Sequence, residues 1–442
     1  MDFYLLEFRL KGIKNIEKEI AINFYKQDIR KFNRENYNVK GIFGRNGIGK
    51  TAIIKGIEIL RNIVLDSDYL ILKSSLLNEM INKKLKKCYL STEFLVIDED
   101  NRKHIFEHSI DLKLKNGKVI IIKEIINKKK LDRKEILRTL IIENGEINRS
   151  KSNYFKNLNE IEKLSMNLLE RKSIISLIIN DIAKDREDKL ESEKFEFIYL
   201  YALYSKINVF THFEDIHYKM LSVNFENKNW LDKIYIDYIN QEGKKRNILL
   251  KTKEEIDFLK KSLNRKERFL KLFNPEIEKI DFEKRDFDEK YYEIEYIFCY
   301  KEYKINFEYE SMGMKSLFRL FDVLDTINNG GIVFVDEIDM SIHDLYLNRL
   351  IEFFAENGKG QFVFTAHNTS ILDTLKKYKN SIDFMTEYKE IKPWIKNGNY
   401  SPRKQYLEGM LPNMPYNIEY YDFFEIFQCK QRIIINFNAF II

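Results

Sequence analysis

The sequence predicts an α/β fold, a mixed sheet with flanking helices, on three observations. Short apolar runs of strand length alternate with helical patterns at both ends of the chain. One of these runs leads into a glycine-rich turn, and another ends in a pair of carboxylates. The stretch from about 155 to 275 is instead charged, with apolar residues spaced for amphipathic helices. We therefore expect α/β lobes at the two ends and a helical insertion between them.

The expected strands and helices follow from these patterns. Residues 6–10 and 20–24 alternate apolar and polar side chains, which predicts two half-buried strands. Further strands, in a meander beside this first sheet, are expected at residues 90–97, 105–112 and 117–126. In the C-terminal half we expect strands at 291–309, 331–335 and 361–365 and helices at 316–327 and 343–355.

The chain divides into four expected parts. Residues 1–150 form an N-terminal lobe, and residues 151–290 form a mostly helical insertion that acts as a lid or interaction region. Residues 291–400 form a C-terminal lobe, followed by a tail at 401–442.

Bulk properties exclude some functional classes. No segment approaches twenty uninterrupted apolar residues, so no membrane span or membrane partner is expected. The three cysteines are isolated and form no metal-binding pair, which fits a reducing cytoplasm. The net charge of +6 over 442 residues is mild; it permits contact with nucleic acid but does not indicate it.

Residues 44–51, GRNGIGKT, match the full P-loop pattern. An apolar run at 39–43 leads in and a helical pattern from Thr51 leads out, which is the context that a phosphate cradle requires. The glycines let backbone N–H groups point at phosphate oxygens. Lys50 is expected to reach the β- and γ-phosphates of ATP, and the Thr51 hydroxyl to bind Mg²⁺.

Residues 331–337, GIVFVDE, predict a buried strand that ends in two carboxylates. The carboxyl end of such a strand is where open α/β sheets bind ligands. We expect Asp336 to hold Mg²⁺ and Glu337 to orient and activate the attacking water. A further apolar strand ends at His367, one crossover helix later, so this side chain is expected at the γ-phosphate.

Residues 310–317, ESMGMKSL, precede an amphipathic helix. Ser311 and Gly313 would present a hydroxyl and a close N–H group at its N-terminus, which makes a second anion site. A plain helix cap is the alternative reading. Because one triphosphate does not need two such sites in one chain, we expect a two-fold dimer in which each copy covers the ATP of the other.

These motifs, together with SIHDL and FTAHNTSILD, occur in the order found in ABC-type ATPases, and the chain resembles that family. Its form is similar to the SMC, RecF and OLD group, especially the OLD-like AAA family ATPases that lack a nuclease domain. The opening LEFRLKGIKNI and the segment RKQYLEG at 403–409 also resemble that branch. The resemblance implies an ABC-type P-loop NTPase head with a helical insertion. It covers both ends of the chain and says little about residues 150–290.

The resemblance also implies roles for individual residues. The ATP-binding residues would be Lys14, Gly44, Asn46, Gly47, Ile48, Gly49, Lys50, Thr51 and Ala52. Thr51 and Asp336 would bind Mg²⁺, and Lys50, Glu337 and His367 would be catalytic. Ser311 and Gly313 would act on the partner's ATP, and Ser341 to His343 would form a D-loop across the dimer. One departure is that no Q-loop glutamine is evident, since the comparable strand reads STEFLV.

Three functions are consistent with the sequence. By resemblance, the leading one is a dimeric ATPase, or a larger assembly, that acts as sensor and scaffold in bacterial anti-phage defence. It would control a separately encoded effector, a TOPRIM-like or HNH nuclease, because only 75 residues follow His367 and they lack the acidic clusters of a TOPRIM domain. The second is a RecF- or SMC-like repair ATPase that binds DNA itself. The third is a nucleotide-dependent assembly module with slow turnover.

The DNA-binding alternative depends on clustered positive charge. The candidate basic runs are Lys83, Lys84, Lys86 and Lys87; Lys128, Lys129, Lys130 and Arg133; and Lys244, Lys245 and Arg246. Most such runs are solvated faces of helices, so the sequence leaves their role open.

Overall fold

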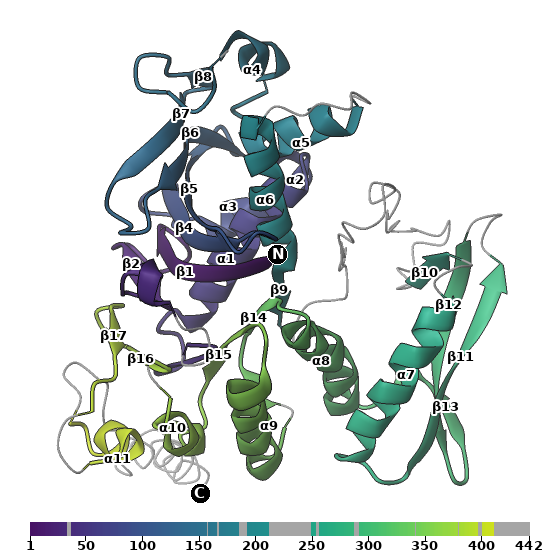
Figure 1. Cartoon of the computed structure of the whole chain (residues 1–442). Coiled ribbons are helices and arrows are strands. Elements are labelled where there is room, and N and C mark those ends of the chain that lie inside the picture. Colours follow the sequence, from purple (N-terminus) through teal and green to yellow (C-terminus); the bar gives the residue numbers. More distant parts are fainter. Residues whose placement is uncertain are drawn as a thin grey trace, which may run out of the picture.

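The structure is a computed structural model (Figure 1). It describes residues 1–32, 37–156, 158–165, 168–184, 192–211, 249–252, 256–286, 291–340, 342–378, 380–396 and 400–410. Ser341 of the expected D-loop, the third basic run and the chain beyond residue 410 lie outside these ranges.

A six-stranded sheet forms the centre of the molecule. Its strands, in spatial order, are β17 (Ile391–Pro393), β16 (Ile382–Met385), β3 (Val39–Phe43), β15 (Gln361–Ala366), β14 (Ile332–Val335) and β9 (Ile207–Phe210). All neighbours are parallel except β16 and β17. Every residue of β3, β14 and β15 is buried, as expected for strands covered on both faces. The predicted strands at the glycine-rich turn and the carboxylate pair are confirmed.

Helices cover one face of this sheet. They are α8 (Met312–Asn328), α9 (Asp344–Asn357) and α10 (Ser370–Leu375). Their apolar side chains share a core with Phe43, Val335 and Phe364 of the central strands. The alternate residues, such as Ile42 and Phe334, belong to a second core on the other face. Because successive side chains of a strand point to opposite faces, the central sheet contributes side chains to both cores.

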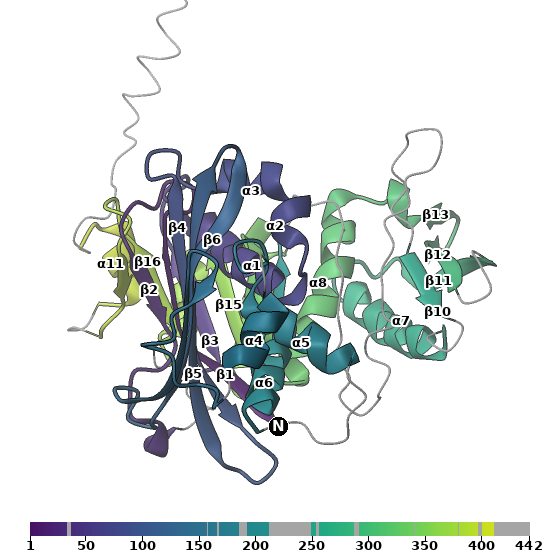
Figure 2. The ribbon, with the colours of Figure 1, turned by 90° about the horizontal axis from the view of Figure 1, so that it is seen from above.

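The second core belongs to a seven-stranded antiparallel sheet. Its strands, in spatial order, are β2 (Ile20–Asn23), β1 (Asp2–Lys11), β4 (Lys87–Ile97), β5 (Lys103–Lys115), β6 (Lys118–Lys129), β7 (Ile136–Glu143) and β8 (Glu146–Ile147). The expected meander beside the first sheet is thus confirmed. On one side of this sheet lie α1 (Lys50–Leu65), α4 (Leu158–Ser165), α5 (Ile174–Lys184) and α6 (Ser192–Lys206) (Figure 2). Two short helices, α2 (Tyr69–Leu72) and α3 (Ser74–Met80), contact β6.

The stretch 151–290, expected to be one helical insertion, has three structural parts. Helices α4 to α6 contribute to the core of the seven-stranded sheet. Strand β9 pairs in parallel with β14 at the edge of the central sheet. Strands β10 (Leu249–Thr252), β11 (Ile277–Asp286), β12 (Tyr291–Tyr300) and β13 (Lys304–Asn306) form a small sheet, against which α7 (Ile256–Lys271) packs. This last part lies beside α8, to the right in Figure 1.

A buried polar network explains why α5 and α6 join the N-terminal lobe. The Tyr204 hydroxyl lies 2.7 Å from Thr92 Oγ1 and 2.7 Å from His108 Nδ1. Glu124 lies 3.0 Å from His108 Nε2 and accepts hydrogen bonds from the Ser173 hydroxyl and from the Ile174 N–H group. Each buried polar group in this network thus has a partner on another element, which fixes the two helices on the sheet.

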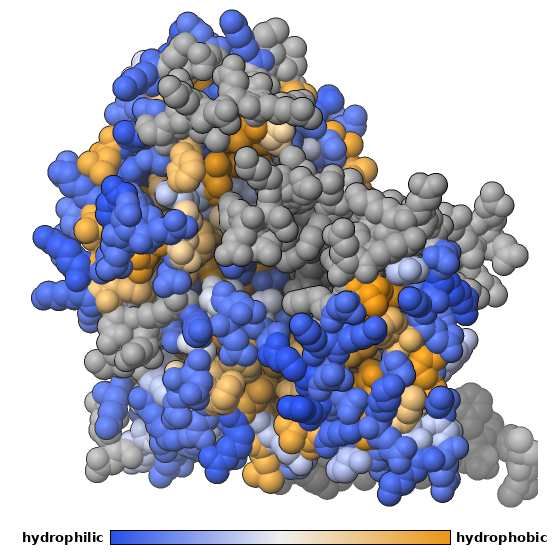
Figure 3. All heavy atoms as spheres, turned by 45° about the vertical axis from the view of Figure 1, so that its right-hand side comes forward, coloured by the Kyte–Doolittle hydropathy of each residue, from blue (hydrophilic) through white to orange (hydrophobic). Residues whose placement is uncertain are grey.

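The surface carries no sign of a membrane-spanning element among the described residues. No helix there is long and apolar enough to cross a bilayer. The face in Figure 3 is mostly hydrophilic, with small hydrophobic groups between the charged side chains.

Candidate active site

The glycine-rich turn lies between β3 and α1, as the P-loop pattern predicts. Gly47 has φ of +72° and Gly49 has φ of +124°, a range that residues with a Cβ rarely adopt. A Cβ atom at Gly49 would also lie 2.6 Å from Ile16 Cδ1. Conformation and space therefore both require glycine at position 49, directly before the N-terminus of α1.

The Lys50 ammonium is held in the turn that precedes it. It donates hydrogen bonds to the Gly44 carbonyl at 2.6 Å and to the Arg45 carbonyl at 3.1 Å. Burial lowers the pKa of Lys50 to about 8, and the carboxylates of Asp336, Glu337 and Asp339 oppose that shift. An ammonium held in this turn, beside the N-terminus of α1, is suited to take up phosphate charge.

The loop after β1 forms another wall of the site. Asn15 Nδ2 donates to the Gly47 carbonyl at 2.9 Å, and the Lys389 ammonium donates to the Asn15 carbonyl at 2.8 Å. Lys14 has φ of +48°, and its backbone is fixed by a hydrogen bond from its N–H group to the Met80 carbonyl. Burial and the charge of Lys55 lower the pKa of Lys14. The strained backbone places a second lysine beside the P-loop.

The two carboxylates follow β14 directly. Asp336 is 7% exposed, and its N–H group donates to the Phe210 carbonyl of β9 at 2.9 Å. Glu337 has φ of +50°, an uncommon conformation for glutamate. Backbone strain of this kind clusters at functional sites, where the surrounding structure enforces it.

Thr365, on the neighbouring strand β15, fixes both carboxylate residues. Its hydroxyl donates to Asp336 Oδ1 at 2.6 Å and accepts from the Glu337 N–H group at 2.8 Å. Among the described residues no other side chain bonds the Asp336 carboxylate. Carboxylate and hydroxyl oxygens are the ligands that Mg²⁺ prefers, so Asp336 and Thr51 fit the metal that the sequence implies.

His367 lies between the P-loop and the carboxylates. Its Nδ1 is 3.5 Å from the Lys50 ammonium, and its Nε2 is 3.7 Å from Glu337 Oε1. Asp339 holds the backbone here, because its Oδ2 accepts the N–H groups of His367 at 2.8 Å and of Asn368 at 2.6 Å. The turn after β14 therefore positions the turn after β15.

These elements enclose one pocket of about 370 Å³. Its lining residues are Lys14, Asn15, Arg45, Asn46, Gly47, Gly49, Lys50, Thr51, Ala52, Glu337 and His367. Among the expected ATP-binding residues, Gly44 contacts Lys50 and Ile48 is buried in the core, but neither lines the pocket. The structure thus brings residues from both ends of the sequence to the carboxyl edge of the parallel strands, where ligands bind in such sheets.

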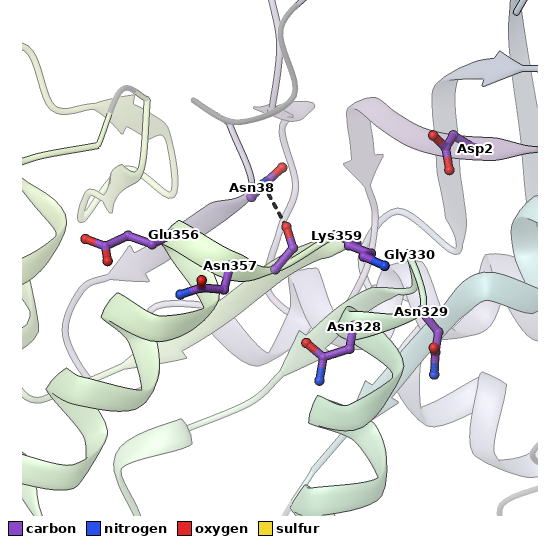
Figure 4. Close-up of a pocket in the computed structure, with 9 residues that line it drawn as sticks. Asp2, Asn38, Asn328, Asn329, Gly330, Glu356, Asn357 and Lys359 are labelled. Atoms are coloured by element: carbon purple, nitrogen blue, oxygen red, sulfur yellow. Dashed lines mark hydrogen bonds between the residues drawn. The ribbon is translucent and has the colours of Figure 1, made fainter.

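A larger hollow of about 560 Å³ lies at the opposite edge (Figure 4). Asn38, Gly330 and Lys359 line it, just before β3, β14 and β15. The side-chain amide of Asn38 donates to the Gly358 carbonyl at 3.0 Å. This hollow contains neither the glycine-rich turn nor the carboxylate pair. We therefore take the smaller pocket as the candidate site on chemical grounds.

The expected signature lies outside this pocket. Ser311 caps α8, where its hydroxyl accepts the Met314 N–H group at 3.2 Å. Ser311, Met312 and Gly313 are all exposed, and Met312 is 68% exposed. A Cβ atom at Gly313 would meet no atom within 4 Å, so packing within this chain does not require a glycine there. In the expected D-loop, His343 caps α9 through its side chain.

Some residues of the site are not evident from the sequence. Asn15 lies in the segment LEFRLKGIKNI and Thr365 in FTAHNTSILD, but no role was predicted for either side chain, nor for Asp339 or Lys389. The segment STEFLV, compared above with a Q-loop strand, lies in β4 of the antiparallel sheet. Its Glu93 forms ion pairs with Lys129 and Arg133. This segment is therefore not part of the candidate site.

The pKa of Lys50 predicts a proton linkage. Because the free ammonium begins to lose its proton near pH 8, and phosphate charge favours the protonated form, ATP binding at about pH 9 should take up about one proton. At about pH 7 uptake should be close to zero, and affinity should fall as pH rises through 8. Calorimetry in buffers of different ionisation enthalpy measures this uptake. Equal uptake at both pH values would contradict the assignment of Lys50.

Comparisons with known proteins give one family match and structural matches at low identity. Residues 41–373 match the family described as "AAA domain, putative AbiEii toxin, Type IV TA system". No curated protein matches the sequence. Two solved structures of the recombination mediator protein RecF of the RecFOR pathway, RecF-ATPrS and RecF-ATP, are similar at 11% and 10% identity. Each comparison covers 89% of this chain and 99% of the other, with TM-scores of 0.37 and 0.40.

Such low scores and identities do not establish a shared function. The family match is the stronger finding, because it spans most of the chain and includes the glycine-rich turn, the segment ESMGMKSL, the carboxylate pair and His367. The chain therefore belongs to this family of AAA-domain P-loop proteins.

Proposed function

We propose that the chain binds ATP with Mg²⁺ and hydrolyses it. The observation that carries this proposal is the single pocket that the P-loop shares with Glu337 and His367. A triphosphate placed there would meet the Lys50 ammonium, the N-terminus of α1 and the Thr51 hydroxyl. Mg²⁺ would neutralise phosphate charge, with Thr51 and Asp336 as its protein ligands.

Three side chains then act in the hydrolysis of ATP. Glu337 accepts a proton from the attacking water and orients it, since a carboxylate at the pocket wall is the base that phosphoryl transfer to water needs. Lys50 stabilises charge on the phosphate oxygens. His367 contacts the γ-phosphate from the side of β15, between Lys50 and Glu337.

We further propose that two copies close over two nucleotides. The N-terminus of α8 supports this, because Ser311 and Gly313 are exposed and lie outside the pocket of their own chain. The open space around Gly313 suits the close approach of a ligand held by another copy. The exposed Met312 adds apolar area to that surface.

The substitution Ser311→Arg tests this closure. We expect the variant to bind ATP as the unchanged protein does but to remain monomeric with ATP, because the larger cation obstructs the shared interface. Light scattering with ATP measures the mass, and calorimetry measures the binding. Ser150→Arg, at an exposed serine after β8 of the antiparallel sheet, is the matched control away from the proposed interface. Loss of ATP binding in Ser311→Arg would place the serine in the pocket of its own chain and contradict the proposal.

The biological role that we propose is control of a separately encoded effector, a nuclease of the TOPRIM-like or HNH kind, in anti-phage defence. The family description, which names a toxin–antitoxin system, supports a setting with two proteins. Co-expression of the chain with its neighbouring reading frame, followed by purification and phage challenge, tests it. The role predicts a co-purifying protein and protection that Lys50→Ala abolishes. A chain that purifies alone and gives no protection would argue against this role, while leaving the ATPase proposal intact.

Direct binding of nucleic acid is a second candidate function, and the ion pairs decide which basic run is suited to it. The run from Lys128 to Arg133 is neutralised: Lys128 pairs with Glu196, Lys129 with Glu93 and Glu107, Lys130 with Glu135, and Arg133 with Glu93. In the first run, Lys83 and Lys84 also have acidic partners.

Lysines without such partners gather at one end of the seven-stranded sheet. Lys87 lies opposite Lys113, Lys115 lies opposite Lys118, and Lys11 ends the neighbouring strand. All five are exposed, and within the described ranges none forms an ion pair. Like charges directly opposite each other destabilise a sheet, so their presence favours a polyanionic partner.

A charge-reversal pair tests this second candidate. Lys87→Glu with Lys113→Glu should weaken binding to duplex DNA and reduce its salt dependence by about two counterions. Lys130→Glu removes a paired lysine and should have a smaller effect. Equal effects of the two changes, or no binding by the unchanged protein, would argue against this surface.

A further inference from the structure

Thr211 directly follows β9 and lies beside the carboxylate of the candidate site. The register pairs Phe210 with Val335, so Thr211 is level with Asp336 on the adjacent parallel strand. On the other side, Phe364 pairs with Val335, which makes Thr365 level with Asp336 as well. Residues at the same level of parallel strands point to the same face. Asp336 is therefore flanked by a threonine on each neighbouring strand.

The two threonines differ in their hydrogen bonds. Thr365 uses its hydroxyl twice, as donor to Asp336 Oδ1 at 2.6 Å and as acceptor from the Glu337 N–H group at 2.8 Å. Thr211 is 8% exposed, and its Oγ1 atom is buried without a hydrogen-bond partner in the part of the chain that the structure describes. Buried polar atoms nearly always have partners, so each exception needs a reason.

A purely structural reason does not account for this hydroxyl. Valine has the same shape as threonine, and at a site without a partner it avoids the cost of burying a hydroxyl. The backbone at this point is also fixed independently, because the Phe210 carbonyl accepts the Asp336 N–H group at 2.9 Å. The hydroxyl therefore serves neither the packing nor the strand pairing, and the polar group nearest along the register is the Asp336 carboxylate.

We infer that Thr211 is a positioning residue for Asp336, and this inference rests on the proposed binding of MgATP. When metal and nucleotide bind, the Thr211 hydroxyl donates to the Asp336 carboxylate from the side of β9, as Thr365 does from the side of β15. Two donors on opposite sides would fix the orientation of the carboxylate that holds the metal. Residues that orient a metal ligand in this way typically contribute about 10- to 100-fold to metal affinity.

Three substitutions separate this role from a structural one. Thr211→Val removes the hydroxyl and keeps the shape, and Thr211→Ser keeps the hydroxyl. Thr92→Val is the control, because Thr92 is also a buried threonine, and its hydroxyl bonds Tyr204 in the core, away from the pocket. Each full-length variant is titrated with a non-hydrolysable ATP analogue over a range of Mg²⁺ concentrations, and its thermal unfolding is recorded.

We expect Thr211→Val to need about tenfold more Mg²⁺ for half-maximal enhancement of analogue affinity, while its Tm stays the same or rises. Thr211→Ser should restore the Mg²⁺ response. Thr92→Val should show the opposite pattern, a lower Tm with an unchanged Mg²⁺ response. If the original protein responds to Mg²⁺ and Thr211→Val responds in the same way, the inference about Thr211 would be overturned. The proposed binding of MgATP would still stand in that case. Absence of any Mg²⁺ response in the unchanged protein would instead overturn the proposed function, and the inference with it.

Discussion

Substitution of Lys50 by alanine is expected to weaken ATP binding strongly and to abolish ATP hydrolysis. The Lys50 ammonium is held in the turn, where it bonds the Gly44 and Arg45 carbonyls. Removal of one partner from a desolvated charge pair costs about 2–5 kcal/mol, which weakens affinity by roughly 30-fold to several thousandfold. Calorimetry with ATP and Mg²⁺ measures the loss, and hydrolysis should disappear with it.

Lys55 provides a matched control on the same helix. It is also buried, but it pairs with Glu58 at 3.1 Å and does not line the pocket. Lys55→Met should therefore lower the thermal stability more than the affinity for ATP. Retention of ATP turnover in a folded Lys50→Ala protein would remove the basis for the site assignment.

Substitution of Glu337 by glutamine is expected to separate binding from turnover. Glutamine keeps the size of the side chain and removes its ability to accept a proton, so hydrolysis should fall by about 10²- to 10⁴-fold. ATP binding should persist, because Lys50, Thr51 and Asp336 are unchanged. With ATP the variant should accumulate as a dimer, because the closed state is no longer released by hydrolysis.

Single-turnover kinetics and light scattering check the two halves of this prediction. Glu356→Gln, at the opposite edge of the sheet, is a control for loss of one negative charge. A turnover rate of Glu337→Gln equal to that of the unchanged protein would exclude Glu337 as the base. A variant that stays monomeric under all conditions would contradict the dimer without affecting the catalytic assignment.

The parts of the fold and site that local pattern encodes were predictable from the sequence. Glycine at 47 and 49 is required by backbone conformation, and the apolar run 332–335 is typical of a strand buried on both faces. Both patterns can be recognised from residues that are adjacent in the sequence. On that basis the sequence predicted β3, β14 and β15 of the central sheet, helices α8 and α9, and β1, β2, β4, β5 and β6 of the antiparallel sheet.

Contacts between distant strands were not predictable in this way. Thr365 bonds Asp336, 29 residues away, only because β15 lies beside β14 in the sheet. The strand at 207–210 falls within the stretch 151–290 that was predicted to be a helical insertion, yet it pairs with β14 and places Thr211 beside Asp336. The free charge of a basic run likewise depends on its neighbours, since Glu93 on β4 neutralises Arg133. Which residues become neighbours depends on the order of the strands in the sheet, and local sequence patterns do not encode that order.

The most direct test is a double-substitution cycle of Thr51→Ala and Asp336→Asn. It measures how much Mg²⁺ enhances the affinity for ATP, and it asks whether the two ends of the chain hold one metal-bound triphosphate. If both side chains bind the same ion, each single variant loses most of the enhancement and the double variant loses little more, so the effects are strongly non-additive. Losses that add independently, or an enhancement that survives in Asp336→Asn, would show that the P-loop and the carboxylate pair do not share a nucleotide.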